Sequence, residues 1–182
     1  VGKLLNNLLV KDFHTIFLLN FASELLVVDT SSTIVSRKKL DLKSADPNFS
    51  SPLISQAEPL VYDNDKLYFG ITIASGITID GPIHYFDRVL KIVYDLSDQT
   101  LTSTVAKYPD FLRENRTYGA NSWSFGTAHI EKDIFAYSFF YDPEIHLYSS
   151  EKLIRSSECP IIDNTTLEPV LLNAPVPEQI KY

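Results

Sequence analysis

The sequence has no methionine and little cysteine, glycine or basic charge. The single thiol, Cys159, excludes an internal disulfide and any Cys-x-x-Cys metal or redox motif. Only 6 glycines are present, and none builds a glycine-rich phosphate loop. The chain carries 16 Lys and Arg against 23 Asp and Glu, so its net charge is −7. No basic run is longer than Arg37-Lys38-Lys39. Because a nucleic-acid-binding surface needs more positive charge, we predict no nucleic-acid partner.

Long apolar runs are also missing. The longest candidate, residues 15–28, is broken by Asn20, Ser23 and Glu24, so we predict no transmembrane segment in this chain. Apolar residues are nevertheless plentiful, at 45% of the 182 residues, which is enough to build a sizeable core. Both ends of the sequence, residues 1–5 and 179–182, resemble the inside of a strand. We therefore expect the chain to be a fragment of a longer protein.

Short runs of β-branched and aromatic residues, bounded by turn-forming residues, predict strands throughout the chain. The clearest predicted strands are residues 15–19, 25–28, 66–73, 89–94, 133–140 and 145–148. Helical spacing is confined to residues 4–9, where Asn6-Asn7 fits a hairpin turn equally well. The motif Asp63-Asn64-Asp65 lacks the glycine and the late glutamate of a calcium loop, so it predicts a hairpin turn. The sequence predicts an all-β fold.

A pattern of strand, loop, strand, polar turn and strand occurs three times. The repeats span approximately residues 8–43, 58–108 and 123–159. Their length predicts blades of a β-propeller with insertions, and apolar residues on both faces of the middle strands suit a stack of sheets. We expect a partial propeller of about three four-stranded antiparallel blades, roughly half of its parent because propellers have four to eight. A β-sandwich with similar hairpins is the alternative.

Each repeat makes a specific prediction about strand pairing. Residues 15–19, 66–73 and 133–140 should each pair antiparallel with the apolar strand that follows. A helix at any of these places, or parallel pairing, would contradict the repeat.

A family resemblance lies in the second half of the chain. It is carried, in this order, by Tyr94-Asp95-Leu96, Lys107-Tyr108-Pro109, residues 135–140, residues 145–148 and Arg155-Ser156-Ser157. These motifs resemble an uncharacterised family of Bacteroidota lipoproteins with a six-bladed, TolB-like propeller. The resemblance implies a propeller fold and a cell-envelope or periplasmic location, with a lipid anchor in the parent protein. It implies no activity and no site residue.

Catalytic constellations are missing from the sequence. The histidines, His14, His84, His129 and His146, stand far apart, and no His-x-His or His-Glu-x-x-His spacing occurs. There is no Gly-x-Ser-x-Gly motif, and Cys159 has no nearby histidine. We predict no catalytic residue, no metal ligand and no cofactor, and we interpret His146 as a structural residue on the face of a strand.

Aromatic and ionisable residues gather in three connections. These are residues 74–88, 109–128 and 141–144, which would share one rim of a propeller. The predicted ligand-binding residues are His84, Asp87, Arg88, Trp123, Tyr141 and Asp142. Such a mixture suits a polar ligand such as a glycan, or a protein partner. The alternative is that these side chains only cover the ends of the core.

The leading functional hypothesis is a non-catalytic binding or scaffold module of an envelope propeller lipoprotein, whose partners are a protein or glycan and the remaining blades. The first alternative is a propeller-type hydrolase or lyase whose catalytic residues lie mainly outside this chain. The second is a eukaryotic secreted glycoprotein module. It rests on the three glycosylation patterns at Asn48, Asn115 and Asn164.

Overall fold

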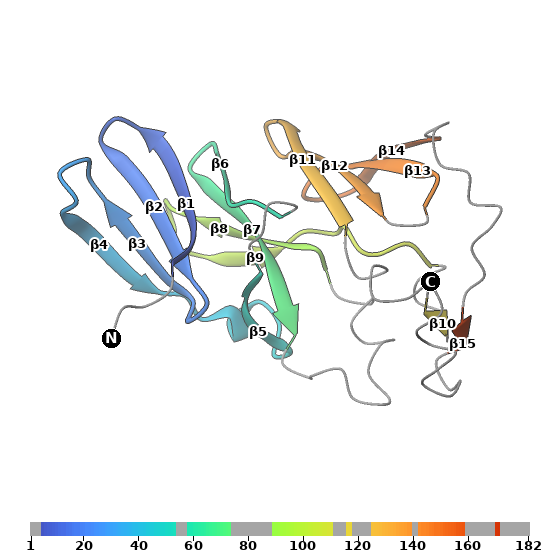
Figure 1. The fold of residues 1–182 in the computed structure, drawn as a ribbon, viewed down its shortest axis with the longest axis horizontal. Helices are drawn as coiled ribbons and strands as arrows, with labels where there is room; N and C mark the ends of the chain where they lie inside the picture. Colours follow the sequence, from blue (N-terminus) through green and yellow to red (C-terminus); the bar gives the residue numbers. More distant parts are fainter. Residues whose placement is uncertain are drawn as a thin grey trace. The chain divides into compact units, whose positions relative to one another are not determined.

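The computed structural model describes residues 5–53, 58–73, 89–110, 116–117, 125–139, 142–158 and 170–171. Their regular structure consists of strands and one 3-10 turn, η1 (Leu42–Ser44) (Figure 1). The strands form three larger antiparallel sheets and a small pairing of β10 (Arg116–Thr117) with β15 (Val170–Leu171). The predicted all-β fold class is confirmed.

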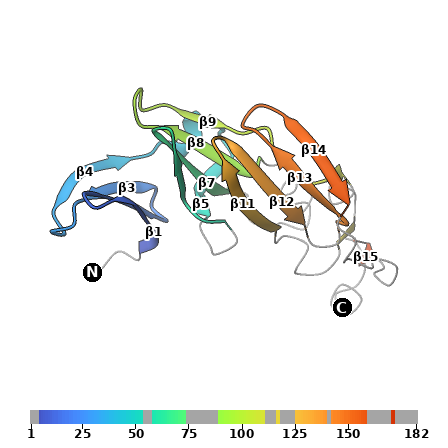
Figure 2. The same cartoon turned by 90° about the horizontal axis from the view of Figure 1, so that it is seen from above.

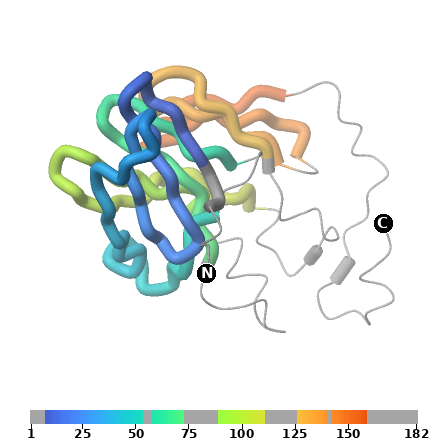
Figure 3. The backbone as a smooth tube through the Cα atoms, turned by 60° about the vertical axis from the view of Figure 1, so that its left-hand side comes forward, coloured from blue at the N-terminus to red at the C-terminus, as the bar shows by residue number. Residues whose placement is uncertain are grey.

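The first sheet is a meander whose strands neighbour each other in chain order. It contains β1 (Leu5–Asp12), β2 (Thr15–Asn20), β3 (Glu24–Val28) and β4 (Ile34–Lys39). Figure 3 traces this path in blue. The strand alternation buries Phe17, Leu19 and Leu25 on one face, at 3%, 0% and 2% exposure. Residues 5–9, for which the sequence allowed either a helix or a hairpin turn, lie within β1.

The second sheet has a divided first strand. It contains β5 (Phe49–Leu53), β6 (Val61–Asp63), β7 (Lys66–Ile73), β8 (Lys91–Asp95) and β9 (Leu101–Ser103). Both β5 and β6 pair with β7, at its end and at its beginning respectively. The turn into β7 has left-handed residues Asn64 and Asp65, with φ of 48° and 58°. This confirms the predicted hairpin, because two such residues form the primed turn that suits the twist of a hairpin.

The first two sheets contact each other through aromatic and polar side chains. The rings of Phe17 and Tyr62 are stacked, with centroids 5.8 Å apart. The ammonium of Lys11 lies 4.5 Å from the centre of the Tyr62 ring. Lys38 Nζ donates a hydrogen bond of 2.7 Å to Gln99 Oε1. The buried face of the first sheet is therefore also the face that contacts the second.

The third sheet repeats the meander of the first. It contains β11 (Phe125–Glu131), β12 (Ile134–Phe139), β13 (Glu144–Tyr148) and β14 (Leu153–Glu158), seen from above in Figure 2. Alternate residues of β12, namely Phe135, Tyr137 and Phe139, are buried on one face. This aromatic face supports the polar residues of β13 described below.

The predicted pairing of the strands is confirmed in all three repeats. Strand β2 pairs antiparallel with β3, β7 with β8, and β12 with β13. Chain neighbours are also spatial neighbours in each meander, which is the strand order of a propeller blade. The chain divides into two compact units, the first with β1 to β9 and the second with β10 to β15. The repeat boundaries and the parent propeller stay predictions.

Candidate functional site

The beginning of β13 carries three groups able to bind a metal or a proton. Asp142 precedes the strand, while Glu144 and His146 are its first and third residues. Successive side chains of a strand alternate between faces, so spacing by two places these residues on one side. One oxygen or nitrogen atom from each residue lies within 4.8 Å of the others. We refer to Asp142, Glu144 and His146 as the β13 cluster.

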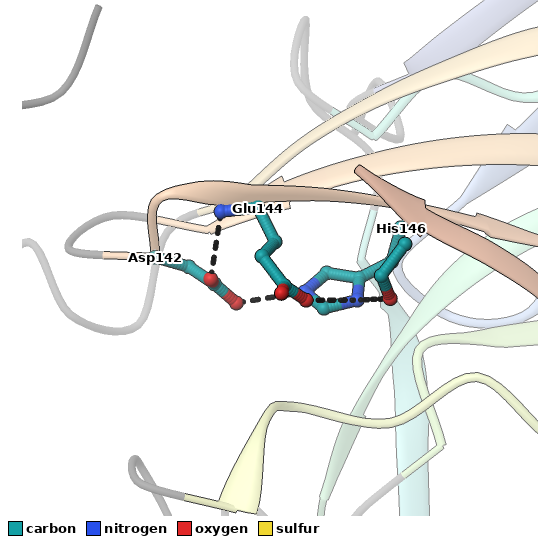
Figure 4. Close-up of polar contacts among 4 residues, drawn as sticks. Asp142, Glu144 and His146 are labelled. Carbon is teal, nitrogen blue, oxygen red and sulfur yellow. Dashed lines mark hydrogen bonds and ion pairs between the residues drawn. The ribbon is translucent and has the colours of Figure 1, made fainter. Parts of the chain in front are cut away.

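Asp142 is the buried member of the β13 cluster, at 5% exposure. Its Oδ1 accepts a hydrogen bond of 2.9 Å from the backbone N–H of Glu144. Its Oδ2 lies 2.7 Å from Nε2 of His146 (Figure 4). The backbone bond holds the carboxylate in one orientation, so the second oxygen faces the imidazole.

His146 is held through both of its ring nitrogens. Besides the contact of Nε2 with Asp142, its Nδ1 lies 2.8 Å from the hydroxyl oxygen of Ser156. Ser156 is the residue directly opposite on β14. An ionised carboxylate can only accept, so in the neutral imidazole Nε2 carries the proton and Nδ1 accepts from the hydroxyl. Phe139 and Tyr148 flank the ring, with centroids 5.8 Å and 6.5 Å away.

Glu144 connects the β13 cluster to solvent. Its Oε2 lies 3.9 Å from Nδ1 of His146, and its side chain is 42% exposed against 13% for the histidine. The set therefore combines one buried carboxylate, one partly buried imidazole and one accessible carboxylate. These are ligands of divalent transition metals.

The six predicted binding residues have different outcomes. Asp142 is described by the structure and lies in the β13 cluster. The others, namely His84, Asp87, Arg88, Trp123 and Tyr141, lie outside the described residues, so their shared rim stays a prediction. Sequence reasoning missed Glu144, His146 and Ser156. The signal for the first two was Asp-x-Glu-x-His at strand spacing.

A second polar feature lies inside the second sheet. Lys91 on β8 is fully buried, and Glu58 is 5% exposed. Burial lowers the pKa of the Lys91 ammonium to about 8, while the nearby Glu58 carboxylate acts in the opposite direction. The side chain of Glu58 reaches Gly70, which is the residue opposite Lys91 on β7. We interpret this pair as part of the interior of the sheet, because neither side chain is open to a ligand.

The first sheet has an open apolar face opposite its buried one. A hollow of 620 Å³ lies on it, and its apolar lining residues are Leu8, Ile16, Leu18, Leu26, Val28 and Ile34. Leu8 and Ile34 are 58% and 49% exposed. Large apolar surfaces of this kind mark places where another element docks.

The fold is similar to that of a solved protein from Bacteroides. The crystal structure of a member of the DUF4221 family from Bacteroides vulgatus superposes with a TM-score of 0.65 and 14% sequence identity. The match covers 88% of this chain and 44% of that one, so the chain spans less than half of that protein's length. At this identity the likeness shows the fold.

Other comparisons add little. BamB from Moraxella catarrhalis matches with a TM-score of 0.36 and 12% identity, over 86% of this chain and 52% of that one, which is too weak to indicate a shared fold. No protein-family model and no curated protein matches the sequence. Among the described residues, no helix is long and apolar enough to span a membrane.

Proposed function

We propose that the chain is a non-catalytic binding or scaffold module formed by consecutive blades of a larger β-propeller. The observation that carries the proposal is the open apolar face of the first sheet, whose opposite face is buried through Phe17 and Leu19. A sheet that is apolar on both faces suits a position between two neighbouring sheets. Among the described residues, one face of the first sheet packs against the second sheet, and its open face is the proposed seat of a further sheet.

The proposed occupant of this seat is a further apolar four-stranded sheet of the parent protein. Its chemistry follows from the lining of the hollow, which is largely aliphatic and also includes the charged residues Glu24, Asp29 and Arg37. The similar Bacteroides structure has more than half of its length outside the match. That length is sufficient for additional sheets of the same kind.

The ligand and the location belong to the proposal as well. The predicted rim, of which Asp142 is the described member, suits a protein or glycan ligand because it mixes aromatic and ionisable groups. A cell-envelope location with a lipid anchor in the parent is supported by the family resemblance, and the Bacteroides structure agrees with a bacterial source of this fold.

Light scattering during size-exclusion chromatography measures the molar mass in solution and so tests whether the open face of the first sheet binds another sheet. We expect the 182-residue chain to self-associate, because the open face exposes apolar side chains such as Leu8 and Ile34. The double substitution Leu8→Lys and Ile34→Lys should reduce association, since both side chains are about half exposed and no charge becomes buried. The matched control is Phe13→Lys with Ile130→Lys, at positions 87% and 56% exposed elsewhere.

Two results would overturn this proposal. A monodisperse wild-type monomer with one cooperative thermal transition would indicate a complete β-sandwich. Equal association of the face variant and the control variant would show that the open face is not the seat.

The alternative is a propeller-type hydrolase or lyase. It is favoured by the chain of contacts from Asp142 through His146 to the Ser156 hydroxyl, since an imidazole held by a carboxylate can activate a hydroxyl nucleophile. A fluorophosphonate probe distinguishes the two hypotheses. A binding module leaves Ser156 unlabelled, whereas labelling that disappears in Ser156→Ala but persists in Ser138→Ala would favour the hydrolase.

A further inference from the structure

We propose that the β13 cluster binds one divalent transition-metal ion of the Zn²⁺ class. Its three donors are carboxylate oxygens of Asp142 and Glu144 and a ring nitrogen of His146, all within 4.8 Å of one another. Zinc takes carboxylate and imidazole ligands at about 2.0–2.2 Å and often keeps a fourth position open. Three protein ligands leave that position for water or for a group of a bound partner. The imidazole favours Zn²⁺ over Mg²⁺ and Ca²⁺, which prefer oxygen ligands.

The two inner donors already face each other. The bond from the Glu144 N–H fixes Oδ1 of Asp142, and this leaves Oδ2 facing Nε2 of His146 at 2.7 Å. An ion would replace the single proton between these two atoms, and a tetrahedral ion would move them apart to about 3.4 Å. Glu144 can close the site from the solvent side by a side-chain rotation, because it is 42% exposed.

Ser156 suits both states of the site. Without metal, Nε2 of His146 donates to Asp142, and Nδ1 accepts from the Ser156 hydroxyl at 2.8 Å. With metal on Nε2, the proton of the neutral ring moves to Nδ1, which then donates to the same hydroxyl. A hydroxyl can accept as well as donate, so it orients the ring in either tautomer.

In the first sheet a neutral side chain accepts the hydrogen bond from the first backbone N–H of the third strand. Its strand β3 also begins with a glutamate, Glu24, whose N–H donates to Oδ1 of Asn20 at 3.0 Å. Asn20 is 3% exposed, like the buried Asp142 of the third sheet. Asn20 is the last residue of β2, four positions before Glu24, whereas Asp142 lies in the turn, two positions before Glu144. The comparison therefore shows that a neutral side-chain amide can satisfy this backbone N–H, and Asp142 does so with a carboxylate.

The same comparison applies to the imidazole. The third residue of β3 is Leu26, and the third residue of β13 is His146. Leu26 lines the open hollow of the first sheet, whereas His146 lies opposite the buried Tyr137 of the third. Among the described parts of these two strands, the carboxylate and the imidazole occur together only in the third sheet.

Isothermal titration with ZnCl₂ tests the proposal. We expect the 182-residue chain to bind one Zn²⁺, and equimolar Mg²⁺ or Ca²⁺ not to displace it. The test variant combines Asp142→Asn, which keeps an oxygen to accept from the Glu144 N–H, and His146→Leu, which keeps an apolar contact with Phe139 and Tyr148. Circular dichroism checks that this variant is folded. This variant should lose the site. His129→Leu, on the same sheet but outside the β13 cluster, should retain it.

Ser156→Ala provides an independent measurement. Because the hydroxyl only orients the ring, its loss should weaken Zn²⁺ binding by about 10–100-fold without abolishing it. Nitrogen chemical shifts of His146 should show the ring proton moving from Nε2 to Nδ1 when Zn²⁺ is added to the wild type.

Three outcomes would overturn the metal site. These are no binding by the wild type, undiminished binding by the folded double variant, and unchanged ring nitrogens of His146 at saturating Zn²⁺. Confirmation would also argue against the hydrolase alternative. A metal on Nε2 makes Nδ1 a donor, and it can then take no proton from Ser156.

Discussion

Gly70 in the second sheet is a glycine because a larger side chain would not fit there, and its backbone conformation does not require glycine. At Gly70 an added Cβ would clash with Oε2 of Glu58 and lie 2.5 Å from the carbonyl oxygen of Leu53. Glycine leaves room for the Glu58 carboxylate over β7, near Lys91, which is paired with Gly70 on β8. Breaking one member of such a buried charged pair is costly, since the other is left in a medium that solvates it poorly.

We expect Gly70→Ala to lower the free energy of unfolding by about 1–3 kcal/mol, because the methyl group must displace either backbone or a buried carboxylate. Urea denaturation measures the loss. Gly126→Ala is the control, since its Cβ would meet the Ser138 hydroxyl at 2.8 Å, and this hydroxyl can rotate away. Equal losses in the two variants would contradict the role of Glu58.

Short hairpins with left-handed turn residues keep strands that follow each other in the chain side by side in the sheet. Strands β11 and β12 are joined through Lys132 and Asp133, between the paired residues Glu131 and Ile134. Lys132 has φ of 50°, a conformation that costs a residue with a Cβ about 1–2 kcal/mol. The hairpin forms in spite of this cost because its strands bury Phe135 and Tyr137.

Lys132→Gly should therefore stabilise the third sheet by up to about 1 kcal/mol, since glycine adopts the left-handed region without strain but has more unfolded freedom to lose. The melting temperature should rise. Lys152→Gly, in the connection between β13 and β14, provides the control. Its φ is not positive, so only the entropic cost remains. A rise in both variants would contradict the turn argument.

At the scale of the molecule, burial is uneven between the faces of the sheets. The first sheet buries Phe17 against Tyr62 of the second sheet, and its other face is open around the 620 Å³ hollow. Its edge strand β4 carries Arg37, Lys38 and Lys39, and charged residues at a sheet edge oppose unwanted strand pairing. The charges therefore disfavour association through the β4 edge, and the lysine substitutions at Leu8 and Ile34 test association through the open face.

The fold class and the order of the strands were predictable from the sequence alone. Alternation of apolar residues and the turn residues between them are local signals, and they determined the antiparallel pairing of β2, β7 and β12 with their successors. The turn at Asn64 and Asp65 was predictable for the same reason. Residues 5–9 were ambiguous, because a short apolar run fits a helix or a strand until its partner β2 is known.

The tertiary structure alone decided what the polar residues do. His146 read as an ordinary strand residue because its partners are selected by register. Ser156 meets it only through the pairing of β13 with β14, and Asp142 only through the turn before β13. Lys91 is likewise a surface residue by type, yet the sheet buries it beside Glu58. Such contacts depend on which residues face each other across strands, and that information is distributed over the whole sheet rather than over a motif.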